Sequence, residues 1–439
     1  MSVVAASRSV AGGGARLGTL LRREWALVTA AVVWLFFVAN FTLLYTIGGD
    51  APHQYFWVQR LYGDRARADG YFFGLGLLEA PFYGVGKLLD HAGVHTLGGI
   101  GIENALVALG TGFFFVIPAA VILVVLLRAL RLPGAAPALL AATFGTSLLF
   151  WAVFSPGKNH PADTALFTLV VYLTFLFFRR SEPARWLPWA LGAVLGFSIT
   201  VRYFAGAEAV MLALVLSFLR RRRDAAVVLL STAAVTGLLF LVPWGLDTPV
   251  FSGALTVSTQ TGFYPLNPLR MLFTEHRGLF VWSPVTVLAA IGLVIVFRNR
   301  PEHRRFFAAS YAMGLGIVLS YVFVSYWDGA WSFGQRYYTP LYPLVVIGLA
   351  GLWEASRGAL RVAVGAAMAV GALWSIYLCL NLALIGWGGV YRGVTFSDGA
   401  GGVAQLPRRT HESTGAYLWS IYNRSRLVKP VVPWPFATR

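Results

Sequence analysis

The sequence is poor in charged residues: Asp, Glu, Lys and Arg make up only 12% of its 439 residues. A soluble globular domain carries roughly 25%. Hydrophobic residues instead make up 57% of the chain, in apolar runs that recur along its whole length. This composition excludes an ordinary soluble enzyme. It indicates an all-α, polytopic membrane protein, for which lipid replaces water as the main solvent.

Cysteine and nucleotide-binding motifs are also scarce. Cys379 is the only cysteine and lies in an apolar run, which excludes an internal disulfide and favours a small buried side chain. No Walker loop or dinucleotide fingerprint follows a strand pattern, so ATP-driven transport has no support. The net charge of +17 comes from short basic clusters between apolar runs. Such clusters are topology signals and contacts for membrane lipid headgroups, and we expect no nucleic-acid partner.

Apolar runs of about 20 residues predict transmembrane helices, and the sequence holds eleven such segments. They lie at 25–48, 104–127, 135–155, 162–178, 187–201, 204–219, 225–245, 280–297, 306–325, 340–353 and 362–388. The first run lacks a small-residue cleavage site, so we interpret it as a retained helix and not as a signal peptide. Residues 71–90, which follow it, mix aromatic, Leu and Gly residues and predict an interfacial amphipathic helix or a re-entrant piece.

The distribution of arginine predicts the orientation. With the N-terminus in the cytoplasm, the inner segments hold nineteen basic residues against five acids, as the positive-inside rule requires. Six of the seven histidines and thirteen of the eighteen acids then fall on the outer side. The long outer segments are 49–103, 246–279, 326–339 and 389–439. We therefore expect a multi-pass protein of the inner membrane, with its functional face and its C-terminus on the outer, periplasmic side.

Two outer segments carry candidate carboxylates. Asp50 closes the first span after a Gly pair; it is either a group held at a cavity or a solvated acid at a helix end. Lys158, His160 and Asp163 share a short turn between two spans, where an acid and a histidine could form an acid/base centre. The alternative for Asp163 is a helix-start acid favoured by the helix dipole.

Three arginines are candidates for binding an anion. Arg202 interrupts an apolar stretch and faces either an anion or Glu208, its possible ion-pair partner. Arg277 and Arg336 stand beside glycines and aromatics at the mouths of two spans, an arrangement that suits a phosphate. Other residues near these cations could line a substrate: Glu275, His276, Tyr337 and Tyr338. No metal site is predicted, because the spacing of His91 and His95 comes with no third ligand.

Three segments resemble a known class of enzymes. GGDAPHQYF after the first span resembles the Gly-Asp-x-Pro-His-Tyr segment of bacterial membrane glycosyltransferases of the GT-C class. HRGLFVWSP and WSFGQRYYTPLYPL resemble two later segments of these enzymes. The class includes family 39, with the protein O-mannosyltransferases, and the lipid A aminoarabinose transferases. The motifs occur in the same order and extend from residue 49 to 345, most of the chain.

The resemblance implies an inverting transferase that moves a sugar from a polyprenyl-phosphate donor to a hydroxyl of an acceptor lipid, glycan or protein. Asp50 matches the aspartate that acts as general base. Asp163 is our candidate for a second carboxylate, because Ala51 stands where many relatives carry one. The donor phosphate is expected to bind Arg336, Arg277 and Arg202. The expected substrate-lining residues are His53, Tyr55, Lys158, His160, Glu275, His276, Tyr337 and Tyr338.

Within this interpretation, residues 1–353 form the catalytic transmembrane module, and 354–439 form a last helix with a short outer tail. No cofactor is required beyond the lipid-linked donor, and a divalent metal is not predicted. A transporter or flippase is the first alternative, but it predicts two related halves with charges near mid-membrane, which the sequence does not show. A glycan polymerase or ligase is the second, for which we expect one large outer loop late in the chain.

Overall fold

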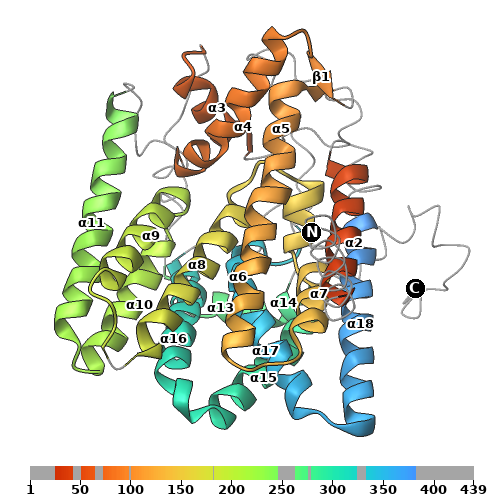
Figure 1. Cartoon of the computed structure of the whole chain (residues 1–439), viewed down its shortest axis with the longest axis vertical. Coiled ribbons are helices and arrows are strands. Elements are labelled where there is room, and N and C mark those ends of the chain that lie inside the picture. Colours follow the sequence, from red (N-terminus) through yellow and green to blue (C-terminus); the bar gives the residue numbers. More distant parts are fainter. Residues whose placement is uncertain are drawn as a thin grey trace, which may run out of the picture.

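A computed structural model describes residues 25–42, 51–64, 73–97, 100–180, 182–245, 263–274, 278–323 and 333–381. Within these ranges the chain is a bundle of helices with one minimal hairpin (Figure 1). The first half contains α2 (Trp25–Phe41), α3 (Ala51–Leu61), α4 (Phe73–His91), β1 (Thr96–Leu97), β2 (Ile100–Gly101), α5 (Ile102–Gly110), α6 (Val116–Ala129), α7 (Ala135–Gly145), α8 (Asn159–Arg179), α9 (Leu187–Val201), α10 (Ala205–Phe218) and α11 (Arg222–Gly245). The second half contains α13 (Asn267–Phe273), α14 (Leu279–Trp282), α15 (Val285–Asn299), α16 (Arg304–Ser320), α17 (Tyr342–Ala355) and α18 (Gly358–Asn381). β1 and β2 pair antiparallel, with Thr96 opposite Gly101.

Each of the eleven expected segments contains helix in its described part. Within the described residues, five helical stretches are long and apolar enough to cross a membrane: Ile102–Ala129, Asn159–Arg179, Arg222–Pro243, Pro301–Phe323 and Gly358–Leu380. The segment expected as one helix at 280–297 is divided, because α14 ends at Trp282 and α15 begins at Val285. Pro284 disfavours the helical conformation at the residue before it, Ser283. The all-helical membrane architecture is thus confirmed, while the count of eleven crossings stays a prediction.

Close backbone approach at small residues holds the bundle together. A Cβ on Gly292 of α15 would lie 1.8 Å from the carbonyl oxygen of Gly348 in α17. On the other side, Thr232 of α11 donates a hydrogen bond to the carbonyl of Gly192 in α9 at 3.1 Å. Glycine permits this approach because it has no side chain, and van der Waals contact is the main attraction between helices in lipid. Alanine at Gly292 would force α15 and α17 apart.

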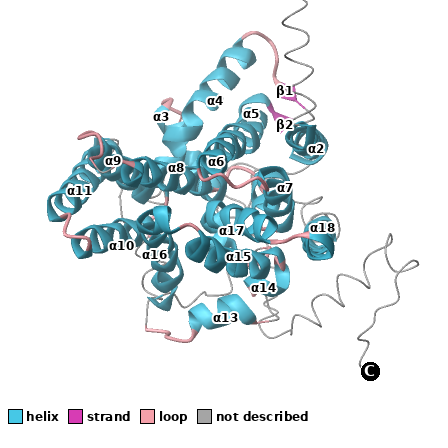
Figure 2. Cartoon of the chain, turned by 60° about the horizontal axis from the view of Figure 1, so that its bottom comes forward, coloured by secondary structure: helices cyan, strands magenta, loops and turns pink. Residues whose placement is uncertain are grey.

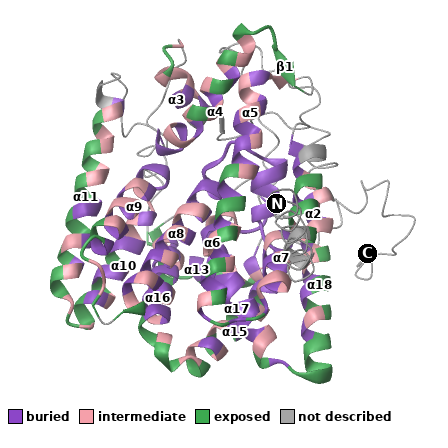
Figure 3. Cartoon of the chain, viewed as in Figure 1, coloured by how far each residue is buried: buried purple, intermediate pink, exposed green. Residues whose placement is uncertain are grey.

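Buried side chains fill the space between the helices, and exposed apolar side chains lie on the outer surface of the bundle. Figure 2 shows α17 enclosed by its neighbours, and every residue from Tyr342 to Leu352 in that helix is buried. In Figure 3 the exposed residues follow the outward faces of α11 and α18. Many of these exposed residues are large and apolar, among them Leu230 and Leu238 of α11 and Val362 of α18. This is the distribution expected where lipid covers the outer surface.

The segment after the first helix forms a cap at one end of the bundle, where α3, α4 and β1 lie together (Figure 1). Helix α4 covers most of residues 71–90, for which a helix was one expectation; its interfacial position stays a prediction. Its first turn packs closely on α9, since a Cβ on Gly74 would lie 2.2 Å from Thr200 Oγ1. Leu75 belongs to a buried cluster with Ala162 of α8 and Val201 of α9. The cap therefore sits directly on the starting turn of α8 and the last turn of α9.

Candidate functional site

Several of the predicted site residues cannot be placed. Asp50, Glu275, His276 and Arg277 lie outside the described residues. His53 belongs to α3, but its side chain is outside the described part of the chain. The remaining candidates do have positions, and most of them gather where α8 begins.

The start of α8 is shaped by two short π-helical turns, Thr111–Phe115 and Phe150–Phe154. They pack together, and the hydroxyl of Thr111 accepts a hydrogen bond from the amide of Gly157 at 3.2 Å. Gly157 has φ of 74°, a left-handed conformation that glycine adopts without strain. Asn159 then donates to the carbonyl of Val201 at 3.2 Å. The contact of Asn159 ties the start of α8 to the end of α9. Short π-helical turns such as these often occur at functional sites.

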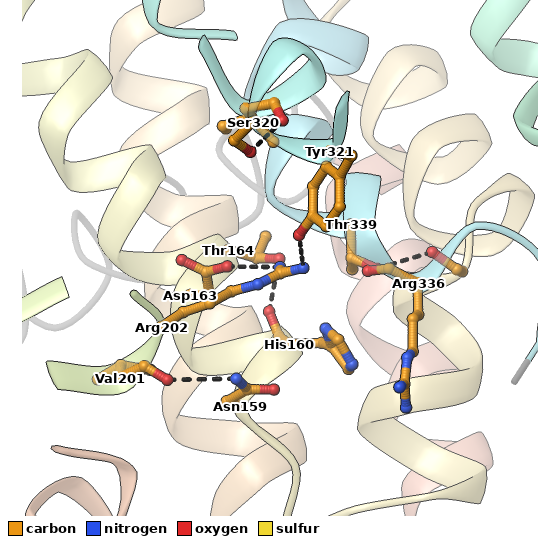
Figure 4. A network of polar contacts seen from close by, with 12 residues as sticks. Asn159, His160, Asp163, Thr164, Val201, Arg202, Ser320, Tyr321, Arg336 and Thr339 are labelled. Atoms are coloured by element: carbon orange, nitrogen blue, oxygen red, sulfur yellow. Dashed lines mark hydrogen bonds and ion pairs between the residues drawn. The ribbon is translucent and has the colours of Figure 1, made fainter. Parts of the chain in front are cut away.

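Asp163 and Arg202 form a buried ion pair. The guanidinium Nη1 lies 2.8 Å from Asp163 Oδ2, and both side chains are at least 95% buried. A second guanidinium nitrogen donates to the hydroxyl of Tyr321, at the end of α16 (Figure 4). Arg202 occupies the extended break between α9 and α10, which allows its side chain to reach α8. The structure thus pairs Arg202 with an acid 39 residues away, while Glu208 is buried nearby and within the electrostatic influence of both groups.

Aromatic rings connect this pair to Arg336, another of the arginines that we expected to bind an anion. Tyr337 stacks on Tyr321 with ring centroids 4.6 Å apart. The guanidinium of Arg202 lies 5.7 Å from the Tyr337 ring and that of Arg336 lies 5.1 Å from it. Such cation–π contacts contribute about 0.5–2 kcal/mol each. Segments of α8, the α9–α10 break and residues 336–341 therefore meet at one place, and they bring Asp163, Arg202, Arg336 and Tyr337 together.

Lys158 and His160 complete the cluster from the first turn of α8. The Nζ atom of Lys158 lies 4.7 Å from the ring of Trp151, and the His160 ring lies 4.8 Å from the same indole. Both side chains are buried. Figure 4 shows the imidazole between Asp163 on one side and Arg336 on the other.

Two of the predicted substrate-lining tyrosines lie in packing clusters. Tyr55 packs with Val58, Tyr83 and Val107 in the core of the cap. The hydroxyl of Tyr338 contacts the sulfur of Met271 at 3.5 Å, and its ring meets Tyr321 edge-on. These neighbours explain the positions of both side chains without a substrate, so their lining role stays a prediction.

A small polar network links the residue that follows α3 to helix α4 in the cap. Asp64 accepts hydrogen bonds from Tyr83 and from Lys87, the latter at 3.0 Å. Burial alone would raise the pKa of Asp64, but these two donors outweigh it and lower that pKa. His95 contacts Asp90 at 2.7 Å, and His91 ends α4 beside the carbonyl of Lys87. Among the described residues no three potential ligands converge.

Glu79 is a site candidate that sequence reasoning missed. Its side chain is fully buried in α4, and neither carboxylate oxygen has a hydrogen-bond partner in the part of the chain that the structure describes. It lies one turn after Leu75, on the face that packs against α8 and α9. Burial raises the pKa of Glu79 to about 8. The available signal was a single acid within an apolar, aromatic segment, which favours a functional group over a solvated one.

The buried Glu79 predicts a stability that falls with pH. Below its unfolded pKa of 4.5 both states carry the proton; as pH rises towards about 8, only the folded state holds it. The protein should therefore lose on the order of 2 kcal/mol between pH 6 and pH 9. The Glu79→Gln variant should lack this loss in unfolding curves measured across that range. The exposed acid Glu302 provides a control, since Glu302→Gln should keep the wild-type slope, and an unchanged slope in Glu79→Gln would contradict the assignment.

Comparison with known proteins identifies the fold. The chain is similar to the crystal structure of ArnT from Cupriavidus metallidurans bound to undecaprenyl phosphate, with a TM-score of 0.54 and 14% identity over 82% of this chain and 70% of that one. It is also similar to the oligosaccharyltransferase of Archaeoglobus fulgidus tethered with an acceptor peptide, with a TM-score of 0.51 and 11% identity over 83% of this chain. The match spans about half, 55%, of the archaeal chain. No family model and no curated protein matches the sequence.

Both structures are membrane glycosyltransferases of the GT-C class. At this level of identity the likeness concerns the fold, and it confirms the resemblance that the three sequence motifs indicated. The protein therefore has a GT-C fold.

Proposed function

We propose that the protein is a membrane glycosyltransferase that moves a sugar from a polyprenyl-phosphate donor to a hydroxyl acceptor on the non-cytoplasmic face, with inversion. The observation that carries this proposal is the buried Asp163–Arg202 pair at the start of α8, with the half-buried Arg336 beside it across Tyr337, within a GT-C fold. Buried ionisable groups at one end of a membrane bundle favour a functional site. A transporter is the less favoured alternative, because the buried ion pair and Arg336 lie together at the start of α8.

The donor is proposed from the cations and from a structural neighbour. Arg336 presents a planar guanidinium, which binds phosphate oxygens in a forked geometry. The ArnT structure to which the chain is similar contains undecaprenyl phosphate. Arg202 already binds Asp163 and Tyr321, so we assign it a positioning role beside the phosphate. Arg277 remains our second proposed phosphate ligand.

The proposed reaction needs one base and one anion site. Asp50 accepts the proton of the acceptor hydroxyl as the acceptor oxygen forms a bond to the anomeric carbon. The bond between that carbon and the donor phosphate oxygen breaks, and its electron pair stays on the oxygen. The products are the glycosylated acceptor and polyprenyl phosphate, which carries one more negative charge than the donor phosphate did. Cations at the phosphate stabilise this developing charge.

Glu79 and Asp163 are two of the described acids that we considered as support for Asp50. Asp163 is neutralised by Arg202, which makes it better suited to hold that arginine than to take a proton. Glu79 has no such partner among the described groups, so we propose that it binds a hydroxyl group of a substrate. A protonated carboxyl can both donate and accept such a bond.

The test is direct incubation of the purified protein with a panel of polyprenyl-phosphate pentoses and hexoses. Release of polyprenyl phosphate, together with a glycosylated acceptor, is the expected result for at least one donor. A folded protein that releases polyprenyl phosphate from none of them, with lipid, glycan and peptide acceptors supplied, would contradict the proposal.

Arg336→Ala should raise the donor concentration needed for half-maximal rate by about 10- to 100-fold. The reason is that a charge-assisted hydrogen bond to phosphate contributes about 1.5–3 kcal/mol. The measurement is the initial rate of polyprenyl phosphate release against donor concentration. Arg305→Ala, which changes an exposed arginine of α16, is the matched control and should keep the wild-type donor dependence. A donor dependence in Arg336→Ala equal to that of wild type would remove the phosphate role.

A further inference from the structure

The turn that carries Arg336 is only weakly determined by its own backbone. Residues 336–341 form a 3₁₀ helix, in which hydrogen bonds have poorer geometry than in an α-helix. Pro340 has no amide to donate, and it disfavours helical geometry at the residue before it, Thr339. The turn also follows Gly334, which has a φ of 50° in the left-handed region. Contacts with other elements must therefore help to fix the place of Arg336.

A chain of two hydroxyl groups, one of them on Thr339 (Figure 4), provides such a contact. Thr339 Oγ1 donates a hydrogen bond to the carbonyl oxygen of Arg336 at 2.7 Å, which closes the turn. The same hydroxyl lies 2.8 Å from Ser147 Oγ, 192 residues away in the sequence. A hydroxyl has one proton to donate, and Thr339 uses its proton on Arg336. Ser147 is therefore the donor to Thr339, and the chain runs from Ser147 through Thr339 to the backbone of Arg336.

Ser147 also holds the other side of the candidate site. It lies after the end of α7 and before the π-helical turn Phe150–Phe154. Its carbonyl oxygen accepts a hydrogen bond from the amide of Trp151 at 3.2 Å. The indole of Trp151 in turn contacts the ring of His160 in the first turn of α8. Ser147 thus connects the start of α8, through its carbonyl, to the turn of Arg336, through its hydroxyl.

A second hydrogen bond from the same end of α7 supports this arrangement. Thr143 lies near the end of that helix, and its Oγ1 atom is 2.7 Å from the hydroxyl of Tyr342. Tyr342 begins α17 directly after the turn. Ser147, Thr339 and Tyr342 are all buried, and hydrogen bonds in such surroundings are stronger than in water. The C-terminal end of α7 therefore contacts residues 336–342 at two points.

We propose that Ser147 and Thr339 are positioning residues, which fix Arg336 relative to the start of α8. This inference rests on the proposed function, in which Arg336 binds the donor phosphate. Neither hydroxyl is assigned a contact with substrate, because both act through the backbone of Arg336. Such control is important for a transferase, since a displacement of about 1 Å at a substrate-binding group can lower the rate by roughly 100-fold.

Four variants and a control test the chain of hydroxyls in the transfer reaction. Thr339→Val removes a hydroxyl at nearly unchanged shape, and it should raise the donor concentration for half-maximal rate by about 3- to 10-fold. Ser147→Ala removes the donor of the chain and should have the same effect. Thr339→Ser and Ser147→Thr keep the hydroxyls and should stay close to wild type. Thr232→Val is the matched control, because it removes a buried threonine hydroxyl that links α11 to α9. It should keep the wild-type donor dependence.

A double variant separates positioning from a general loss of stability. Because Thr339 acts through Arg336, the combination of Thr339→Val with Arg336→Ala should need no more donor than Arg336→Ala alone. Two independent effects on the donor requirement would multiply instead. Full multiplication in the double variant would therefore overturn the positioning role.

Amide hydrogen exchange of the purified protein, followed by mass spectrometry, tests the link without any substrate. Thr339→Val and Ser147→Ala should each speed exchange in residues 333–342 by about 3- to 10-fold. Exchange in α9 and α11 should stay as in wild type. Thr232→Val should leave exchange in residues 333–342 unchanged. Wild-type exchange of that segment in both Thr339→Val and Ser147→Ala would overturn the link.

These measurements distinguish failure of the inference from failure of the proposed function. If no polyprenyl-phosphate sugar is transferred, the proposed function fails, and calorimetric titration with a short-chain prenyl phosphate takes the place of the rate. Weaker binding in Thr339→Val, with recovery in Thr339→Ser, would then support the positioning role. Wild-type affinity in Thr339→Val, or a wild-type protein that binds no prenyl phosphate, would overturn it.

Discussion

Sugar transfer is expected to fall by about 10²- to 10⁴-fold in the Asp50→Asn variant, which is the contribution typical of a positioned general base. Asparagine has nearly the same shape as aspartate but cannot take the proton of the acceptor hydroxyl. The protein should still fold and should still bind prenyl phosphate, because neither depends on that proton transfer.

The decisive measurement is the rate of polyprenyl phosphate release at saturating donor, with prenyl phosphate binding as the test of folding. Asp90→Asn is the matched control: Asp90 is also an acid of the first outer segment, but its side chain is 39% exposed and contacts His95. That variant should transfer sugar at the wild-type rate. Normal turnover in Asp50→Asn would remove Asp50 as the base and leave Glu79 as the acid to test next.

The helical architecture could be predicted from the sequence because apolar runs long enough to span lipid have few other solutions. The interruption at Arg202 was visible for the same reason, since a charged residue stands out in an apolar run. The sequence did not reveal which acid forms the ion pair with Arg202. Asp163 and Arg202 meet only because α9 ends at Val201 and Arg202 adopts an extended conformation, which directs its side chain to α8. The sequence offered an anion or the nearer acid, Glu208, as the alternatives for Arg202.

The burial of Glu79 was also not visible in the sequence. Residues 71–90 predict an interfacial amphipathic helix or a re-entrant piece, and an acid of such a helix is normally on the face towards water. The structure buries it because α4 packs on α8 and α9 through Leu75, one turn earlier. Burial of a polar face depends on the neighbouring helices and not on the helix itself. The roles of Asp50, Arg277, Glu275 and His276 remain predictions from motifs, because these residues lie outside the described ranges.

Removing one partner of the Asp163–Arg202 pair should destabilise the bundle, and the cost should differ between the two partners. Arg202→Met leaves Asp163 and Glu208 as buried acids without their cation, which should cost about 3–5 kcal/mol of unfolding free energy. Asp163→Asn should cost less, because Arg202 keeps its contacts with Tyr321 and Tyr337 and remains close to Glu208. The triple variant Arg202→Met, Asp163→Asn and Glu208→Gln should recover most of the loss, since it removes all three charges.

Unfolding curves in a denaturing detergent measure these differences, and the triple variant shows how much of the loss comes from buried charge without a partner. Asp224→Asn is the control: the Arg221–Asp224 pair has the same 2.8 Å distance, but its side chains are 27% and 24% exposed. Loss of this partly exposed pair should lower the free energy of unfolding by only about 0–1 kcal/mol, because water screens the charges. If Arg202→Met and Asp163→Asn destabilise the protein equally, Glu208 does not share the arginine. The cluster is then a simple pair, in which removal of either charge leaves one buried charge without a partner.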